Sequence, residues 1–241
     1  MNRQTRYVPF LLLAACAPGE RLGTIEQGIC LCPPEDDAAP PDAALDAGQP
    51  DAAPHVFRKV HFLADSIPEY GASSVEVTSA RAMIKASYPG EFFDQAVGGR
   101  SLHFYAYDAA RRAYIVDGIR TRPTQPPSEV WIALVYNDWA GAAWTSGQYW
   151  VGLVEFNAAL RAAIPGVRVI CQGPHFGGTR LNSRGETLDQ FILMMAAGGC
   201  DQFIDGRLAG IERPADYVDT VHLNDQGHAK WATFSIAEGG W

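Results

Sequence analysis

Three residues that lie far apart in the sequence, Ser66, Asp219 and His222, could together perform nucleophilic catalysis. A serine hydroxyl is a weak nucleophile at neutral pH until a base removes its proton, and a histidine base works best when a carboxylate fixes its tautomer. Asp219 precedes His222 by three residues, which is close enough for one loop to carry both side chains. The three residues therefore predict a serine nucleophile with a histidine base and an aspartate partner.

Cleavage of an ester by such a serine also needs hydrogen-bond donors for the oxyanion of the tetrahedral intermediate. The backbone N–H groups of Ser66 and Gly99 and the side-chain amide of Asn137 are the candidates. Glycine suits the second position because a side chain would obstruct the approach of the acyl group to the backbone. We therefore expect an oxyanion hole formed by Ser66, Gly99 and Asn137.

The order of apolar segments predicts the elements that position these residues. Short strand-like runs alternate with longer segments of helical period, which is typical of a parallel sheet covered by helices on both faces. The expected strands are 59–64, 92–97, 130–135, 167–171 and 202–204, and the expected helices are 74–87, 148–163, 186–197 and 225–238. Ligands bind beyond the carboxyl ends of the strands in such folds, so the polar residues after the first three strands are expected to meet there.

Four blocks of sequence resemble those of the GDSL, or SGNH, hydrolase family, in that family's order and across almost the whole folded part. The blocks are Phe62-Leu63-Ala64-Asp65-Ser66, Ala96-Val97-Gly98-Gly99-Arg100-Ser101, Tyr136-Asn137-Asp138 and Asp219-Thr220-Val221-His222-Leu223-Asn224. The resemblance implies an α/β fold, a flavodoxin-like three-layer α/β/α sandwich with a five-stranded parallel sheet. It also implies hydrolysis of esters through an acyl-enzyme without a metal or an organic cofactor.

By position, the resemblance makes Ser66 the nucleophile, His222 the base and Asp219 its partner, with Gly99 and Asn137 as oxyanion donors. The second block is most similar to the acetylesterases of the family that deacetylate polysaccharides. This similarity implies an acetylated carbohydrate as the substrate class.

Two positions depart from the family's pattern. Ala64 replaces the usual glycine before Asp65, which is tolerable if the residue keeps a negative φ. Tyr136 adds bulk near the expected oxyanion donors and narrows the expected acyl pocket. A short acyl group such as acetyl is therefore expected, and Arg100, Tyr136 and Trp139 are the candidate substrate contacts.

The beginning of the chain predicts export and a membrane anchor. Basic residues precede a short apolar run, and Leu13-Ala14-Ala15-Cys16 resembles the bacterial lipoprotein signal, in which the cysteine is lipidated after cleavage. The interpretation is a signal peptide over 1–15, an anchored tether over 16–54 and a catalytic domain over 55–241. The alternative is an ordinary cleaved signal in which Cys16 has no role.

The composition of the tether supports this division. Residues 33–54 are almost wholly Pro, Ala, Asp and Glu, which cannot bury enough apolar surface to fold. Six of the acidic residues behind the net charge of −8 lie there, so the domain is close to neutral and gives no support for nucleic-acid binding. The expected membrane contact is the lipidated Cys16, and the domain is expected to face the periplasm or the cell surface.

Cys171 and Cys200 both fall at or beside expected strands. Disulfides form in oxidising compartments outside the cytoplasm, so we favour a bond between these two cysteines.

Other function classes remain open on the sequence. A lipase, a thioesterase or an acyltransferase would use the same residues, whereas a non-catalytic glycan-binding lipoprotein would form no covalent adduct at Ser66. A metal-dependent hydrolase would use Asp65, Asn137, Asp138 and His222, and it is disfavoured because no second histidine stands in ligand spacing.

Overall fold

The computed structural model describes residues 58–69, 76–122 and 125–240. The expected signal peptide, Cys16 and the tether lie outside the described residues. In the ranges that are described, no helix combines the length and the apolar composition needed to cross a membrane.

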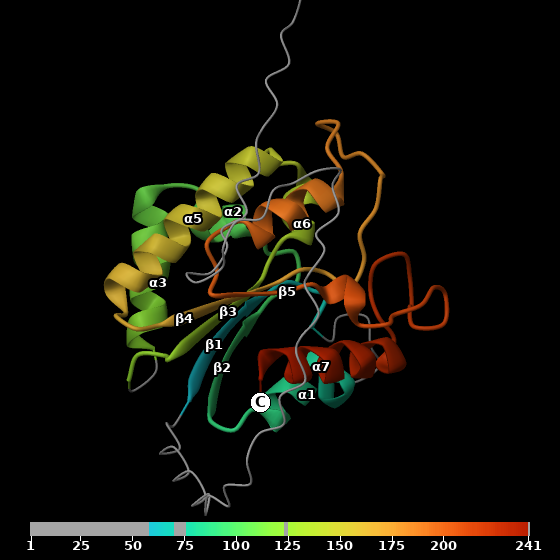
Figure 1. The fold of residues 1–241 in the computed structure, drawn as a ribbon, viewed down its shortest axis with the longest axis horizontal. Helices are drawn as coiled ribbons and strands as arrows, with labels where there is room; N and C mark the ends of the chain where they lie inside the picture. The colour runs from blue at the N-terminus through green and yellow to red at the C-terminus, as the bar shows by residue number, and fades with distance from the viewer. Residues whose placement is uncertain (1–57, 70–75, 123–124, 241) are drawn as a thin grey trace, which may run out of the picture. The chain divides into compact units, whose positions relative to one another are not determined.

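A five-stranded parallel sheet forms the middle layer of the domain, with strand order β2-β1-β3-β4-β5 (Figure 1). The strands are β1 (Lys59–Ala64), β2 (Glu91–Ala96), β3 (Glu129–Ala133), β4 (Arg168–Gln172) and β5 (Gln202–Ile204). β2 lies on one side of β1, and β3, β4 and β5 lie on the other. The carboxyl ends of β1 and β3 therefore flank a topological switch point, where ligands bind in folds of this type.

Helices cover both faces of the sheet (Figure 1). One face carries α1 (Ala80–Ser87) and α7 (Asp225–Gly239). The other face carries α2 (Leu102–Ala106), α3 (Ala109–Thr121), α5 (Ser146–Ala163) and α6 (Leu188–Ala196). The short helix α4 (Tyr136–Gly141) follows β3, and two 3-10 turns, η1 (Glu76–Thr78) and η2 (Gly206–Leu208), complete the order.

Two apolar cores separate the three layers. Successive side chains of a strand point to opposite faces, so Phe62 and Trp131 pack under α1 and α7, whereas Leu63 and Ile132 pack under the other helices. β1 and β3 are buried along their whole length. The three-layer α/β/α sandwich predicted from the sequence is confirmed.

Three helices were missed by the sequence analysis. α2 and α4 have only five and six residues, and α3 buries only Ile115, Val116 and Ile119 along its thirteen residues. So few buried positions give a weak apolar stripe. The signal that could have located α3 is Asp108, whose side chain caps the helix by accepting the N–H of Arg111 at 2.7 Å.

Some predicted boundaries were also wrong. The expected strand 130–135 pairs only as far as Ala133, because Leu134 and Val135 are buried in the turn that leads into α4 rather than in the sheet. The expected helix 74–87 is α-helical only from Ala80, where the side chain of Ser79 accepts the N–H of Ala82 and caps the helix. Apolar residues can stay buried beyond the last hydrogen-bonded residue of a strand, as Leu134 and Val135 do here, so the apolar run is longer than the strand itself.

A disulfide joins Cys171 to Cys200, whose Cα atoms lie 5.9 Å apart. The bond connects β4 to the residues just before β5, on the side of the sheet that α5 and α6 cover. These are the two cysteines that the sequence analysis favoured for pairing.

Candidate active site

Ser66 follows β1 directly and is half-buried at the carboxyl edge of the sheet. The preceding Asp65 is only 1% exposed, and its Oδ1 accepts the N–H of Ile67 at 2.9 Å. This bond fixes the sharp turn that presents the serine. Ala64, at the position where the GDSL pattern has glycine, is the last residue of β1 and does not have a positive φ, so a methyl group is tolerated there.

The three residues expected to form a triad meet in the structure. His222 Nε2 lies 3.2 Å from Ser66 Oγ, and His222 Nδ1 lies 2.7 Å from Asp219 Oδ2. When the proton of the neutral ring is on Nδ1, that N–H donates to the carboxylate and Nε2 accepts from the serine hydroxyl. The geometry suits removal of the serine proton by His222.

The loop that carries the histidine is stabilised largely by its own hydrogen bonds. Asp219 Oδ1 accepts the backbone N–H groups of Val221 and His222, both at 2.7 Å, and a bridge between Tyr217 and Leu223 closes the loop. Burial alone would raise the pKa of Asp219, but the hydrogen bonds from the His222 ring and from the two N–H groups outweigh it and lower the pKa to about 2. The carboxylate is therefore ionised at neutral pH.

Gly99 lies in the loop after β2 with a φ of +72°, a conformation that side chains disfavour. A Cβ added there would meet no atom within 4 Å, so the backbone conformation, rather than crowding in the free protein, requires glycine. Among the described residues, no protein acceptor takes the N–H of Gly99 or that of Ser66. Both donors are available for an oxyanion.

The amide of Asn137, the third expected donor, already has protein contacts. Its Nδ2 donates to the carbonyl oxygen of Arg100 at 2.8 Å and lies 3.5 Å from Asp65 Oδ2. An amide nitrogen carries two hydrogens, and the second contact is too long to be a strong hydrogen bond. One hydrogen therefore anchors the Gly99 loop, while the other can turn to an oxyanion.

Asp138 ties the loop after β2 to α4. Its side chain is wholly buried, and its two oxygens accept the N–H groups of Leu102 and His103 at 2.7 and 2.9 Å. These are the first N–H groups of α2, which have no acceptor within the helix. Asp138 thereby positions Gly99 relative to Asn137.

Two buried carboxyl groups lie behind the nucleophile. Burial raises the pKa of Asp65 and that of Asp138 to about 7 each. Backbone N–H groups from Ile67, Leu102 and His103 oppose the rise, and the negative charge of Asp138 raises the pKa of Asp65 further. Both groups therefore titrate near neutral pH.

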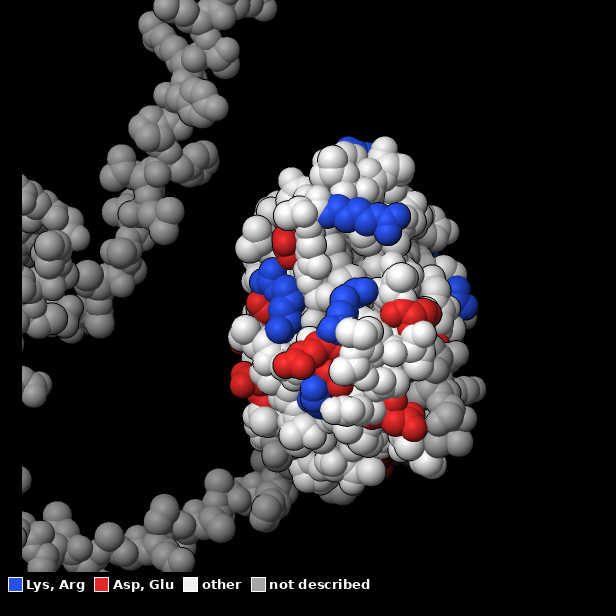
Figure 2. Space-filling model, turned by 90° about the vertical axis from the view of Figure 1, so that its right-hand side faces the viewer, with Lys and Arg blue, Asp and Glu red and all other residues white. Residues whose placement is uncertain are grey.

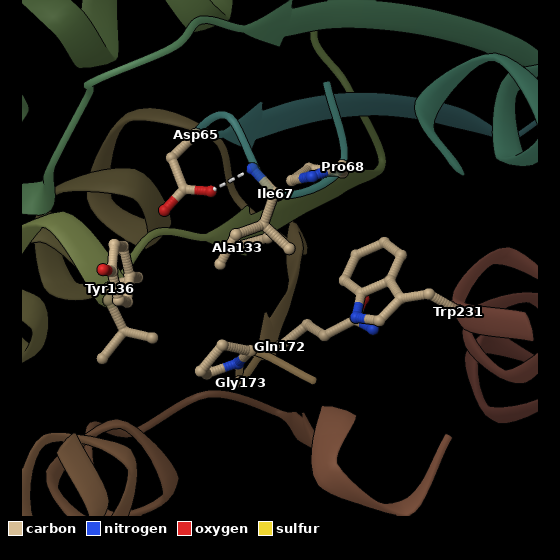
Figure 3. A pocket seen from close by; sticks show the side chains of 10 residues that line it. Asp65, Ile67, Pro68, Ala133, Tyr136, Gln172, Gly173 and Trp231 are labelled. Carbon is tan, nitrogen blue, oxygen red and sulfur yellow. Dashed lines mark hydrogen bonds between the residues drawn. The ribbon is translucent and has the colours of Figure 1, made fainter. Parts of the chain in front are cut away.

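A small cavity of about 10 Å³ lies beneath the turn of the nucleophile. Figure 3 shows the Asp65 carboxylate turned toward the N–H of Ile67, with Gln172 and Trp231 further along the cavity. Such a volume holds about one water molecule, so it is too small for a substrate group. Substrate has to bind elsewhere.

A larger pocket of about 310 Å³ opens beside the triad. Its wall includes Thr220 and Val221, which stand between Asp219 and His222 in the sequence. The other residues that line it are Tyr136, Trp139, Phe176, Gly177, Gly178, Arg180, Leu188 and Arg213. Its aromatic walls and its position beside the loop that carries Asp219 and His222 suit the alcohol part of an ester.

The three candidate substrate contacts lie in different surroundings. Tyr136 and Trp139 line the larger pocket, although Trp139 is only 8% exposed and its Nε1 donates to the carbonyl oxygen of Glu186. The guanidinium of Arg100 instead stacks on Phe104, 3.8 Å from the ring centroid. The described residues contain no cluster of three or more His, Cys, Asp or Glu that could hold a metal ion.

Sequence reasoning did not single out Phe176 or Arg213 as site residues. Both lie in loops that follow strands, after β4 and after β5. Their position beyond the carboxyl ends of the strands was the available signal.

No family model matches the sequence, and no curated protein matches it either. Solved structures with a similar fold include a GDSL-like lipase from Bacteroides ovatus, with a TM-score of 0.54 and 15% identity over 73% of this chain and 51% of that one. The psychrotrophic esterase EstA from Pseudoalteromonas sp. has a TM-score of 0.54 and 12% identity over 75% of this chain and 96% of that one.

A family two carbohydrate esterase from Clostridium thermocellum, solved in complex with cellohexaose, has a TM-score of 0.52 and 14% identity over 75% of this chain and 63% of that one. The chain thus spans about half the length of the GDSL-like lipase and less than two thirds of the carbohydrate esterase. At these identities the similarity establishes the fold.

Proposed function

We propose that the chain is an SGNH-type serine esterase that hydrolyses a short-chain ester, acetyl in the first place, through an acyl-enzyme. The observation that carries this proposal is the pair of contacts from His222, at 3.2 Å to Ser66 Oγ and at 2.7 Å to Asp219 Oδ2. Esterases and a lipase among the solved structures of similar fold support the same class of reaction.

In the acylation step, Ser66 Oγ attacks the carbonyl carbon of the ester while His222 Nε2 takes the hydroxyl proton. The carbonyl electron pair moves to oxygen, where the N–H groups of Ser66 and Gly99 and one amide hydrogen of Asn137 stabilise it. The ionised Asp219 stabilises the imidazolium. When the intermediate collapses, the alcohol leaves with the proton of His222, and the acyl group stays on Ser66.

In the deacylation step, His222 takes a proton from a water molecule that attacks the acyl carbonyl. The second tetrahedral intermediate releases the acid, and the proton on His222 returns to Ser66 Oγ. Every proton transfer uses the same ring nitrogen, so the account needs no further catalytic group.

The proposed substrate is an acetylated carbohydrate. Tyr136 stands next to Asn137 in the sequence and lines the pocket beside the triad, and its bulk at this position supports a short acyl group. Trp139 and Phe176 contribute aromatic surface to the pocket beside the triad, and aromatic faces can stack on sugar rings. A carbohydrate esterase of similar fold, solved with cellohexaose, supports the same class.

We also propose that the protein is exported and lipid-anchored through Cys16, with the tether holding the domain away from a bacterial membrane. The order of basic, apolar and small residues before Cys16 supports this proposal. A palmitate analogue fed to bacteria that express the chain should label the wild type. Labelling that persists in Cys16→Ser would contradict lipidation at this residue.

The enzymatic proposal is tested by hydrolysis of p-nitrophenyl acetate. Ser66→Ala should reduce kcat by at least about 10³-fold, because the nucleophile is removed. Ser183→Ala is the matched control, since Ser183 is exposed in the loop after β4, and it should retain the wild-type rate. Equal activity in Ser66→Ala and wild type would refute the proposal.

A further inference from the structure

The pocket beside the triad contains two arginines, Arg180 and Arg213, that have no role in the reaction described above. They come from different loops, one after β4 and one after β5. Thr220 and Val221 form another part of the same wall, so a group bound in this pocket lies beside the loop that carries Asp219 and His222.

Neither guanidinium has an acidic partner among the described residues. In the part of the chain that the structure describes, no carboxylate lies within 4.0 Å of Arg180 or Arg213. Arg207, which follows β5 on the same side of the sheet, differs: its guanidinium contacts Asp205 at 2.7 Å and Asp189 at 3.0 Å. The charges in the pocket are therefore available to a ligand, whereas the neighbouring charge is neutralised.

Arg213 is held in place by aromatic rings. Its guanidinium carbon lies 4.3 Å from the centroid of Tyr217 and 5.4 Å from that of Phe176. A stacked guanidinium keeps N–H groups at its edge for a planar anion, and its fixed position reduces the entropy lost on binding.

The positive charges of Arg180 and Arg213 both act on Tyr136, which also lines the pocket. Burial raises the pKa of the Tyr136 phenol, Arg180 and Arg213 oppose the rise, and the negative charge of Asp219 adds to it. Both arginines and the triad carboxylate therefore act electrostatically on this phenol.

Figure 2 looks onto the side where the loops after β4 and β5 lie, and it shows Lys and Arg side chains spread over a mainly uncharged surface with acidic side chains among them.

We propose that the alcohol part of the substrate bears an anionic group, a carboxylate or a phosphate, which Arg180 and Arg213 bind. An acetyl group does not need a pocket of about 310 Å³, so the alcohol part is the one that fills it. Aromatic walls take its ring, and the guanidinium groups bind the oxygens of the anion by charge-assisted hydrogen bonds. This inference rests on the proposed esterase function and adds a substrate class to it.

The test uses three aryl acetates that differ in one substituent: 4-acetoxybenzoate, 4-acetoxyphenyl phosphate and the neutral 4-acetoxybenzamide. The measured quantity is the ratio of kcat/KM for each anionic ester to that for the amide. This ratio is compared between the proteins, so that the intrinsic reactivity of the leaving groups cancels. The proteins are the wild type, the double variant Arg180→Gln/Arg213→Gln, and Arg120→Gln. Arg120 is a matched control because it is an exposed arginine of α3 outside the pocket.

The double variant should lower the ratio at least about fivefold for the preferred anion, whereas Arg120→Gln should keep the wild-type ratio. Raising the salt concentration to about 0.5 M should reduce the wild-type ratio as well, since exposed charges are screened. The two anionic esters show whether the site prefers a carboxylate or a phosphate. If the double variant keeps the wild-type kcat/KM ratio for both anionic esters, the inference is overturned and the esterase proposal stays intact.

If the folded wild type cleaves none of the three esters, the esterase proposal fails, and calorimetry decides about the arginines. The ligands are then 4-hydroxybenzoate, phenyl phosphate and 4-hydroxybenzamide. Tighter binding of an anion than of the amide, lost in the double variant, supports the anion site. Equal affinity for all three overturns it.

Discussion

The two halves of the candidate site are built in different ways. The nucleophile side, which comprises Asp65, Ser66, Asn137 and Asp138, follows the ends of the two central strands, and its carboxyl side chains are buried. The base loop, residues 217–223, carries Asp219 and His222 with side chains that are 51% and 31% exposed. Its hydrogen bonds are mostly internal.

This difference separates residues that serve both catalysis and folding from residues that serve catalysis alone. On the nucleophile side, groups that position the reacting atoms also hold the domain together, so substitutions there should change both rate and stability. In the base loop, the positioning groups are exposed, so substitutions should change the rate with little effect on folding. The following predictions test this separation, from the largest effect on rate to the smallest.

Asp219→Asn should lower kcat/KM for p-nitrophenyl acetate by roughly 10²- to 10⁴-fold, because an amide no longer fixes the tautomer of His222 or stabilises its imidazolium. The melting temperature should stay within about 2 °C of the wild type, since the side chain is half exposed. Asp117→Asn, at an exposed position of α3, is the control and should change neither quantity. A large loss of stability in Asp219→Asn would show that the base loop, like the nucleophile side, contributes to folding.

Asp138→Asn should lower both rate and stability. One backbone N–H of α2 would face the NH₂ group of the asparagine instead of an acceptor, which costs about 1–3 kcal/mol of folding free energy and displaces the Gly99 loop. We expect kcat to fall by roughly tenfold or more. Urea denaturation and steady-state kinetics measure the two effects.

Asp201→Asn is the control for this substitution. Its carboxylate also accepts a backbone N–H, that of Val169 at 2.7 Å, but it lies at the start of β5, away from the carboxyl edge of the sheet. It should lose stability and keep kcat. If Asp138→Asn behaved in the same way, the proposed link between α4 and the Gly99 loop would be wrong.

Tyr136→Ala should change the choice of acyl group more than the rate with acetate. Tyr136 stands next to Asn137 in the sequence, and we expect removal of its phenol to make room for a longer acyl chain. The ratio of kcat/KM for p-nitrophenyl butyrate to that for the acetate should therefore rise by roughly tenfold. Tyr107→Ala removes an exposed tyrosine from the end of α2 and should leave the ratio unchanged. A ratio that stays constant in Tyr136→Ala would exclude Tyr136 as the limit on acyl length.

The last prediction concerns the pH dependence of the free energy of unfolding, for which no effect on rate is claimed. The pKa of Asp65 rises from its usual value of 3.8 to about 7 in the fold, so the folded state binds the proton more tightly than the unfolded chain. This group's contribution to stability therefore falls as pH rises between about 4 and 7. Burial lowers the pKa values of His61, His175 and His228 to about 4, 3 and 4, and these rings act in the opposite direction as pH rises toward 6.5.

A difference measurement isolates the carboxyl group from the histidines. The unfolding free energy of Asp65→Asn minus that of the wild type should increase from pH 5 to pH 7, by up to about 1.4 kcal/mol per pH unit. Urea denaturation at the two pH values gives both quantities. A difference that is independent of pH would show that Asp65 is ionised throughout this range.

The sequence predicted the central part of the molecule better than its periphery. The strand expected at 59–64 and the buried start of β3 were correct because continuous apolar runs mark strands that are covered on both faces. Ser66, Asp219 and His222 could be chosen because their types and order carry a recognisable chemistry. α3 was missed because a helix that buries three side chains leaves little apolar periodicity.

The contacts between loops were beyond reach of the sequence. Asp138 accepts two N–H groups from α2, and this contact depends on how α4 packs. The donation from Asn137 to the carbonyl of Arg100 likewise depends on a positive φ at Gly99. Arg213 and Phe176 gave no spacing pattern at all, because loops from two strands bring them together.

Covalent labelling shows directly whether Ser66 is an activated nucleophile. The full chain would be treated with a fluorophosphonate, digested, and mapped by mass spectrometry, with Ser66→Ala and Asp219→Asn in parallel. We predict one phosphonyl adduct on Ser66, slower labelling in Asp219→Asn and none in Ser66→Ala. A folded wild type that forms no adduct, or that forms it on another residue, would contradict the assignment of Ser66 as an activated nucleophile.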